Sequence, residues 1–168
     1  VVSFKAYPEA MTGRKGTIYD GVLELAKDDF FQAMEVGWMH HWQERDRVAK
    51  LLRTTAMDIA YATQPRSITE GLNINALDED TRQSDVESIK SEVDKADHLG
   101  ASRIRLIAGK DPGDDQRDEA KRQLERSIDE ICDYAGDKDI FVTLKIFDRD
   151  LAKESLIGTF EDTRDVAE

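Results

Sequence analysis

The sequence predicts an α/β fold made of repeated strand and helix units. Apolar runs of strand length alternate with segments whose apolar residues recur every three or four positions. Helices that end at Gly100 and Gly136 are each followed, after a short gap, by an apolar strand. Because such crossovers are right-handed and give parallel strands, two architectures remain: a five-stranded doubly wound open sheet, or part of an eight-stranded βα barrel. The length of 168 residues fits one domain, residues 1–168.

The first half of the chain predicts three strands separated by two helices. The strands are apolar runs that end at Pro8, at Gly37 or before a Gln-Pro pair, and they cover residues 1–7, 31–37 and 57–62. Apolar positions spaced by three and four predict amphipathic helices over 18–27 and 43–55. The next residues, which include Gly71 and Asn73, are interpreted as a long loop.

The second half predicts three helices and two strands. Asp78 is a plausible N-cap and Gly100 a C-terminal stop for one helix, and a strand follows over 102–108. The acidic loop at 109–115 is expected to cap the next helix, which ends at Gly136. The last two elements are a strand over 140–147 and a helix that begins at Thr159.

The charge and cysteine content limit the partners. Lys and Arg total 24 against 36 Asp and Glu, a net charge of −12 without a basic patch, so binding to nucleic acid is not expected. No apolar run approaches the ~18 residues that span a bilayer, and residues 1–7 lack the features of a signal peptide. The single cysteine, Cys132, excludes an intrachain disulfide, favours a cytoplasmic location, and is expected to be buried.

Ligands of either architecture bind at the carboxyl ends of the strands, so candidate site residues follow each strand. Glu35 ends an apolar strand, where its carboxylate needs a partner, and both a role in a pocket and a structural ion pair stay open. Lys145 interrupts another apolar strand, and an ion pair with Asp148 or Glu35 is favoured over a Schiff-base or charge-neutralising role. Glu35 and Lys145 are therefore the candidate catalytic residues.

Four further residues are candidates for substrate binding from their strand-end positions: Tyr7, Trp38, His40 and Gln64. His40 and His41 are adjacent, so their rings point in opposite directions along an extended chain and do not readily share one metal ion. Trp38 could cover a polar substrate, although packing against a helix is favoured. The chain contains no glycine-rich phosphate loop after the first strand, no nucleophile elbow and no HExxH motif.

Several segments share a recognisable order and spacing: Leu72-Asn73, the helix end at 97–101, the strand at 103–108 with the following 109–113, and the stretches 147–150 and 153–158. Together they resemble the sugar phosphate isomerase/epimerase family with the xylose isomerase-like barrel. The strand end at 35–38 fits as well, so the resemblance covers the whole chain. It implies a (βα)8 TIM barrel of which this chain holds about the first five units, so that the domain is expected to be incomplete at its C-terminus.

The resemblance also implies a divalent metal (Mn, Mg, Co or Zn), held by acidic residues and a histidine from strands five to eight. Only the first of these ligands falls within the chain, and Lys145 stands at its position. Because an ammonium group cannot coordinate a metal, no metal ligand is assigned in this sequence.

The function implied by the resemblance is an isomerase or epimerase of a small sugar or hydroxy-ketone, in which Glu35 assists proton transfer next to a carbonyl. A non-catalytic sugar-binding barrel is the alternative. An endonuclease IV-like DNA-repair enzyme is disfavoured by the net charge. A homodimer is one way to cover the open strand edges of such a chain.

Overall fold

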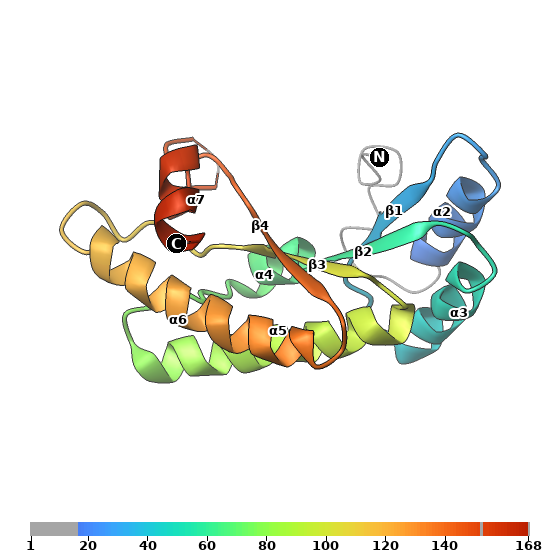
Figure 1. Cartoon of the computed structure of the whole chain (residues 1–168), viewed down its shortest axis with the longest axis horizontal. Coiled ribbons are helices and arrows are strands. Elements are labelled where there is room, and N and C mark those ends of the chain that lie inside the picture. The colour runs from blue at the N-terminus through green and yellow to red at the C-terminus, as the bar shows by residue number, and fades with distance from the viewer. Residues whose placement is uncertain (1–16, 152, 168) are drawn as a thin grey trace.

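The computed structural model describes residues 17–151 and 153–167, which form six helices and four strands (Figure 1). The helices are α2 (Thr17–Ala26), α3 (Trp42–Leu52), α4 (Gln64–Glu70), α5 (Glu79–Leu99), α6 (Arg117–Gly136) and α7 (Phe160–Ala167). The strands are β1 (Ala33–Val36), β2 (Asp58–Ala62), β3 (Arg103–Ile107) and β4 (Phe141–Lys145). The predicted first strand, with Tyr7, lies outside the described residues.

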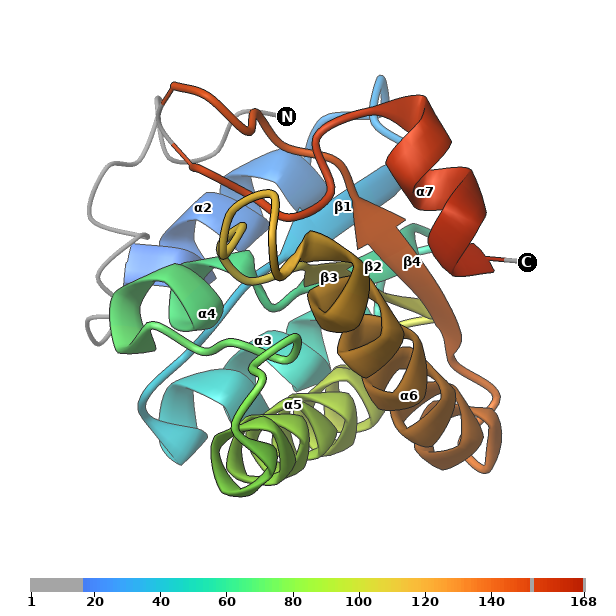
Figure 2. The ribbon, with the colours of Figure 1, turned by 90° about the vertical axis from the view of Figure 1, so that its left-hand side faces the viewer.

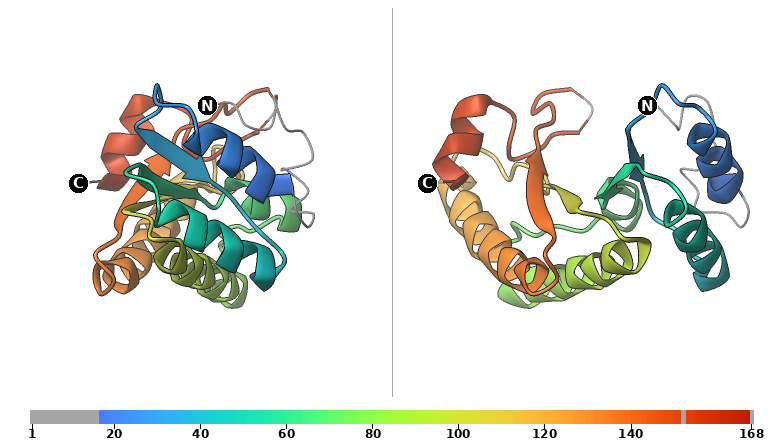
Figure 3. Two further views of the ribbon diagram at one scale, coloured as in Figure 1. Left: turned by 90° about the vertical axis from the view of Figure 1, so that its right-hand side faces the viewer. Right: turned by 45° about the vertical axis from the view of Figure 1, so that its right-hand side comes forward.

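The four strands form one parallel sheet in the order β1-β2-β3-β4. A doubly wound sheet reverses its strand order at a switch point, whereas in the described sheet each strand pairs with the next one along the chain. The crossover helices α3, α5 and α6 lie along one side of the strands, as both panels of Figure 3 show. This winding is that of a βα barrel, which confirms the predicted barrel-type fold over the open sheet.

The two faces of the sheet have different side chains because strand residues alternate in direction. The face toward the helices is apolar and buried, and its members are Met34, Val36, Ile59, Tyr61, Ile104 and Leu106. The opposite face carries Glu35, Arg103, Arg105 and Phe141, which are exposed. Figure 2 shows α5 and α6 side by side on the helical side of the sheet. The core therefore lies between strands and helices, and the opposite face is available for polar chemistry.

The ends of α5 form as its sequence predicts. The Asp78 side chain accepts a hydrogen bond of 2.9 Å from the Thr81 backbone N–H, and Gly100 closes the helix in the left-handed conformation with φ 74°. On the buried side, the Arg82 guanidinium is fully enclosed and donates to the Ser127 hydroxyl of α6 at 2.8 Å. These contacts join α5 to α6 beneath the sheet.

The prediction of a long loop after β2 is wrong in its first part, because Gln64 begins the short helix α4. Pro65 lies in its first turn, where the missing N–H has no helical partner to lose. Gly71 ends the helix with φ 69°. A seven-residue helix whose only large apolar residue is Ile68 shows no periodicity that sequence reasoning could detect.

Two local predictions about α6 are also wrong. Cys132 is exposed, because the buried face of the helix runs through Leu124, Ile131 and Ala135, and Cys132 lies one position further around. The acidic loop does not cap the helix either: the N-cap is Gln116, without a side-chain bond, and Asp111 instead pairs with Arg117.

No helix in residues 17–151 and 153–167 is long and apolar enough to cross a bilayer.

Candidate functional site

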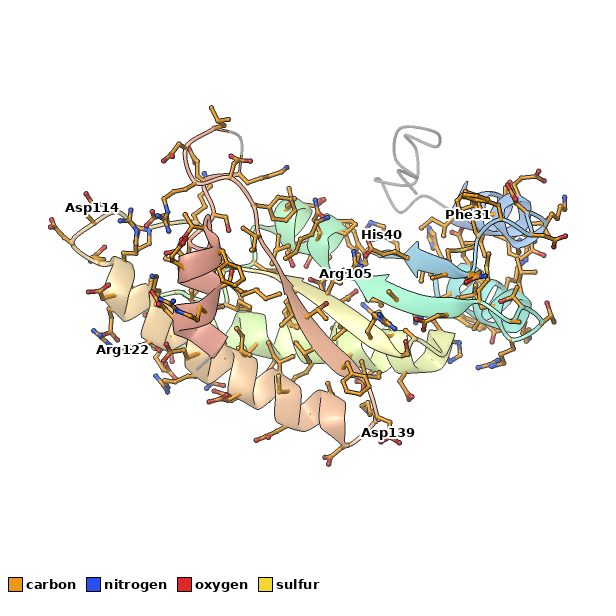
Figure 4. All side chains as sticks on the ribbon, turned by 45° about the horizontal axis from the view of Figure 1, so that its top comes forward. Phe31, His40, Arg105, Asp114, Arg122 and Asp139 are labelled. Carbon is orange, nitrogen blue, oxygen red and sulfur yellow. The ribbon has the colours of Figure 1, made fainter. Side chains whose placement is uncertain are left out.

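The predicted catalytic carboxylate Glu35 forms an ion pair across a strand. Its Oε2 lies 2.8 Å from Nη1 of Arg105, two strands away (Figure 4 labels Arg105). The pair can form because the β2 residues between its two members on this face are Ala60 and Ala62, whose small side chains leave room above them. The structure shows the ion pair, and the role of Glu35 in a substrate pocket stays a prediction. The arrangement places a carboxylate and a guanidinium on the face that a barrel encloses.

The second predicted catalytic residue, Lys145, lies at the end of β4. Its Nζ donates to Oε1 of Gln64 over 3.1 Å and lies 5.0 Å from the centre of the Phe147 ring. Lys145 and Gln64, two site residues that were predicted from separate segments, are therefore in direct contact. The expected ion pair of Lys145 with Glu35 is wrong, because Glu35 pairs with Arg105. The Asp148 carboxylate accepts the backbone N–H groups of Leu151 and Lys153.

Trp38 and His40 follow β1 and contact each other. Their ring centres are 3.8 Å apart with the planes inclined by 47°. Trp38 is buried, as favoured from the sequence, whereas His40 is exposed at the carboxyl end of the sheet (Figure 4). Their predicted role in substrate binding stays a prediction.

A pocket of ≈ 310 Å³ is lined in part by Phe147, the residue whose ring lies near the Lys145 ammonium. Its walls come from α4 and the loop after it, and from the residues that follow β3 and β4. The lining residues are Ser67, Ile68, Gly71, Leu72, Asn73, Ile107, Ala108, Gly109, Lys110, Phe147, Lys153 and Ser155. Phe147 connects the pocket to the Lys145–Gln64 pair, because its ring lines the pocket and also contacts the Lys145 ammonium.

One wall of the pocket is fixed by a close approach of the Asn73 and Asn75 side chains to the backbone at Gly109 and Lys110. The Gly109 N–H donates to Oδ1 of Asn75 at 2.6 Å, and Nδ2 of Asn75 returns a bond of 3.1 Å to the Lys110 carbonyl. A Cβ atom on Gly109 would lie 2.0 Å from Oδ1 of Asn73. Only glycine fits here, and its absence of a side chain lets the Asn73–Asn75 turn pack against the end of β3.

The loop after β4 is held by a cluster of buried charges. Arg149 donates from Nη2 to Oδ2 of Asp162 at 2.5 Å and to the Leu156 carbonyl at 2.8 Å. Lys121 of α6 lies 2.9 Å from the other Asp162 oxygen. Asp162 also helps to cap the N-terminus of α7, since it accepts the Thr159 N–H while the Thr159 hydroxyl accepts the Asp162 N–H. Asp162 therefore holds in place the segment that contains Ser155, one of the residues that line the pocket.

Acid should release this cluster. Burial opposes ionisation of Asp162, but the hydrogen bonds from Lys121 and Thr159 outweigh it and hold the pKa of Asp162 well below its usual range. Because the unfolded chain then binds protons at higher pH than the folded one, this stabilisation is complete above about pH 5 and is lost as pH falls below about 4. Asp162→Asn should lower the free energy of unfolding at pH 7 by about 2 kcal/mol and flatten its acid dependence, measured by urea unfolding. Asp165→Asn, at an exposed position of α7, is the control and should change neither.

The described residues do not fit the divalent metal that the resemblance implies. Residues 17–151 and 153–167 contain no group of three or more His, Cys, Asp or Glu side chains that could hold a metal. At the strand ends, the candidate groups are an ammonium group, an amide, an arginine-paired carboxylate and the single imidazole of His40. Such a set does not supply the three or more oxygen or imidazole ligands of a metal site, so no step is assigned to a metal here.

The sequence reasoning missed Arg105 and most of the pocket. Arg105 could have been found from the alternation of Arg103, Ile104, Arg105 and Leu106, which places both arginines on the face away from the core. Ser67, Asn73 and Ser155 had no such signal, because they meet only through the arrangement of separate loops.

A sequential parallel sheet, helices on its outer side and polar groups at its carboxyl ends define a protein of the βα-barrel class. The family described as xylose isomerase-like TIM barrel matches residues 23–168. The chain belongs to the xylose isomerase-like TIM-barrel family, which confirms the resemblance noted in the sequence. No curated protein sequence matches it.

Three solved structures illustrate the shared fold. D-allulose 3-epimerase from Methylomonas sp. has a TM-score of 0.72 and 17% identity, covering 94% of this chain and 56% of its own. The IOLI protein with a bound zinc atom has a TM-score of 0.70 and 17% identity, with 94% and 55% covered. An AP endonuclease of family 2 from Brucella melitensis has a TM-score of 0.70 and 12% identity, with 88% and 57% covered. The chain thus spans about half the length of each of these proteins.

Proposed function

We propose that this chain carries part of the substrate site of an isomerase or epimerase that acts on a small sugar or hydroxy-ketone. The observation that supports the proposal best is the contact between Lys145 and Gln64 beside a pocket at the carboxyl ends of the strands. The Phe147 ring offers an apolar surface for the carbon face of a sugar, and the Gln64 amide and Lys145 ammonium offer donors to its oxygens. The epimerase fold of one structural neighbour agrees with this class.

In the proposed chemistry, Lys145 and Glu35 have complementary roles in an enolisation: one stabilises the developing charge and the other moves the proton. Abstraction of a proton next to a carbonyl leaves negative charge on the carbonyl oxygen, which the Lys145 ammonium stabilises. Gln64 orients that ammonium through its side-chain oxygen. Glu35 is the carboxylate that exchanges the carbon-bound proton, and Arg105 fixes its position through the ion pair.

Lys145→Met should lower kcat/KM for a responsive ketose by about 100-fold or more, because removal of one group that stabilises developing charge typically has this effect. The measurement is turnover of the purified protein over a panel of ketoses, with and without added divalent metals. Lys50→Met removes the same charge from an exposed position of α3 and should leave turnover unchanged. Absence of turnover on every ketose, or an equal loss in both variants, contradicts the proposed function.

A non-catalytic sugar-binding protein is the second candidate. It is favoured by one observation, that Lys145 occupies the position where the family resemblance implies the first metal ligand. This candidate predicts saturable binding of a ketose without turnover, and Lys145→Glu should then create affinity for Mn²⁺. Turnover separates the two candidates: calorimetric titration with a ketose measures the binding that the second one predicts, and turnover of the same ketose by the unchanged protein contradicts it.

A further inference from the structure

The pocket beside Lys145 has an unusual charge for this protein. The chain contains 36 acidic residues and has a net charge of −12, yet none of the described residues that line the pocket is acidic. Two of them, Lys110 and Lys153, are lysines. The described lining therefore carries two cationic side chains and no carboxylate on a protein that is acidic as a whole, and cationic side chains attract anions.

A buried donor without a partner also lines the pocket. Ser155 is 3% exposed, and its Oγ has no hydrogen-bond partner among the described residues. Its backbone is fixed, because Lys110 and Ser155 form an antiparallel bridge and the Ser155 N–H donates to the Asp148 carbonyl at 3.0 Å. An orphaned buried hydroxyl costs free energy, which a ligand oxygen would recover by accepting its proton.

The two lysines differ in their availability. Lys110 Nζ lies 2.7 Å from Glu154, an exposed pair that a ligand can compete with at little cost. Lys153 forms no ion pair with any described residue, and the Asp148 carboxylate holds its backbone N–H at 2.9 Å. Its ammonium group is therefore free to turn toward an anion in the pocket.

The remaining lining fits the carbon part of a small ligand. Ile68, Leu72 and Phe147 supply apolar surface, and the ≈ 310 Å³ volume exceeds what a single oxyanion fills. A ligand that suits these walls has an anionic group at one end and a short carbon chain that leads toward Lys145.

We propose that this pocket binds an oxyanion group of the ligand, a phosphate or a carboxylate, through Lys153, Lys110 and the Ser155 hydroxyl. The inference rests on the proposed function, since it makes the substrate an acidic derivative of the sugar or hydroxy-ketone. The pocket lies next to the Lys145–Gln64 pair, so an anion held there would direct the carbonyl end of the ligand to that pair.

The test is a titration of the purified protein with inorganic phosphate and, separately, with acetate at low ionic strength, followed by amide chemical shifts. Saturable shifts at Gly109, Lys110 and Ser155 are expected for at least one of the two anions. Tighter binding of phosphate identifies a phosphorylated ligand, whereas acetate binding of equal or greater strength identifies a carboxylate. No saturable shift with either anion overturns the inference.

Variants locate the binding. Lys153→Met and Ser155→Ala should each raise the dissociation constant of the bound anion about tenfold, because each removes one donor to a charged group. Lys50→Met makes the same charge change on α3 and should leave it unchanged, so equal weakening in all three variants would mean unspecific attraction and overturn the inference. Because the titration needs no turnover, an inactive protein that binds phosphate contradicts the proposed function without contradicting the anion pocket.

Discussion

Replacing Glu92 by leucine should lower the free energy of unfolding by about 3–5 kcal/mol, the range found when one partner of a buried ion pair is removed. The Glu92 side chain is fully buried on α5 and pairs with Arg66 at 2.7 Å and with Lys95. It also accepts the hydroxyl proton of Tyr61, a fully buried residue of β2. Glu92→Leu leaves that hydroxyl without an acceptor, Lys95 without its counter-charge, and Arg66 with Glu70 alone. Urea unfolding monitored by circular dichroism measures the loss.

Two further variants test this cause. Glu87→Leu removes an exposed carboxylate from the same helix, whose one ion pair among the described residues is with Lys90, and should cost less than about 1 kcal/mol. The double variant Tyr61→Phe/Glu92→Leu no longer holds an orphaned hydroxyl, so its loss should be smaller than the sum of the single losses. Additive losses, or equal losses for Glu92 and Glu87, contradict this explanation.

The Glu92 cluster also reaches the candidate site through α4. Arg66 lies two residues after Gln64, and it joins α4 to α5 through Glu92, the Ser88 carbonyl and the Ser91 hydroxyl. Burial of Tyr61, reinforced by the Glu92 charge, raises the pKa of its hydroxyl well above its ordinary value, so it remains a donor to Glu92. The core under β2 thus holds the helix that presents Gln64 to Lys145.

The parts of the fold that could be predicted are those whose signals are local. The helix at 79–99 has an N-cap, a periodic apolar face and a C-terminal glycine within one segment, and its bounds agree with the prediction to within a residue. Each described strand is a short apolar run with a turn signal behind it. The strand-end rule then brought Gln64 and Lys145 together correctly, because all parallel strands end on the same side of the sheet.

The parts that could not be predicted depend on contacts between distant segments. The partner of Glu35 is Arg105, 70 positions away, and the pair depends on the small residues Ala60 and Ala62 between them. Strand order and register have to be known before such a pair can be inferred. The pocket has the same origin, since its walls come from α4, from the residues after β3 and from those after β4. No periodicity within a single segment predicts that these three segments lie next to one another.

Gly109→Ala should lower the free energy of unfolding by about 3 kcal/mol, at the upper end of the losses caused by overfilled cores. The added methyl group would lie 2.0 Å from Oδ1 of Asn73 and 2.9 Å from Oδ1 of Asn75, so these two amide side chains have to shift. That movement breaks the 2.6 Å bond from the Gly109 N–H to Asn75 and opens one wall of the pocket. The substitution should therefore also weaken phosphate binding by the pocket, which the amide titration measures.

Gly136→Ala is the matched control, because it makes the same chemical change at a glycine with no atoms within 4 Å of the added methyl group. Gly136 is the last residue of α6, where alanine loses less backbone entropy on folding than glycine. This variant should raise the free energy of unfolding by about 0.5–1 kcal/mol and leave phosphate binding unchanged. If Gly109→Ala were as stable as the unchanged protein, the Asn73–Asn75 turn would yield to a methyl group, and the close approach described for Gly109 would not be required by the fold.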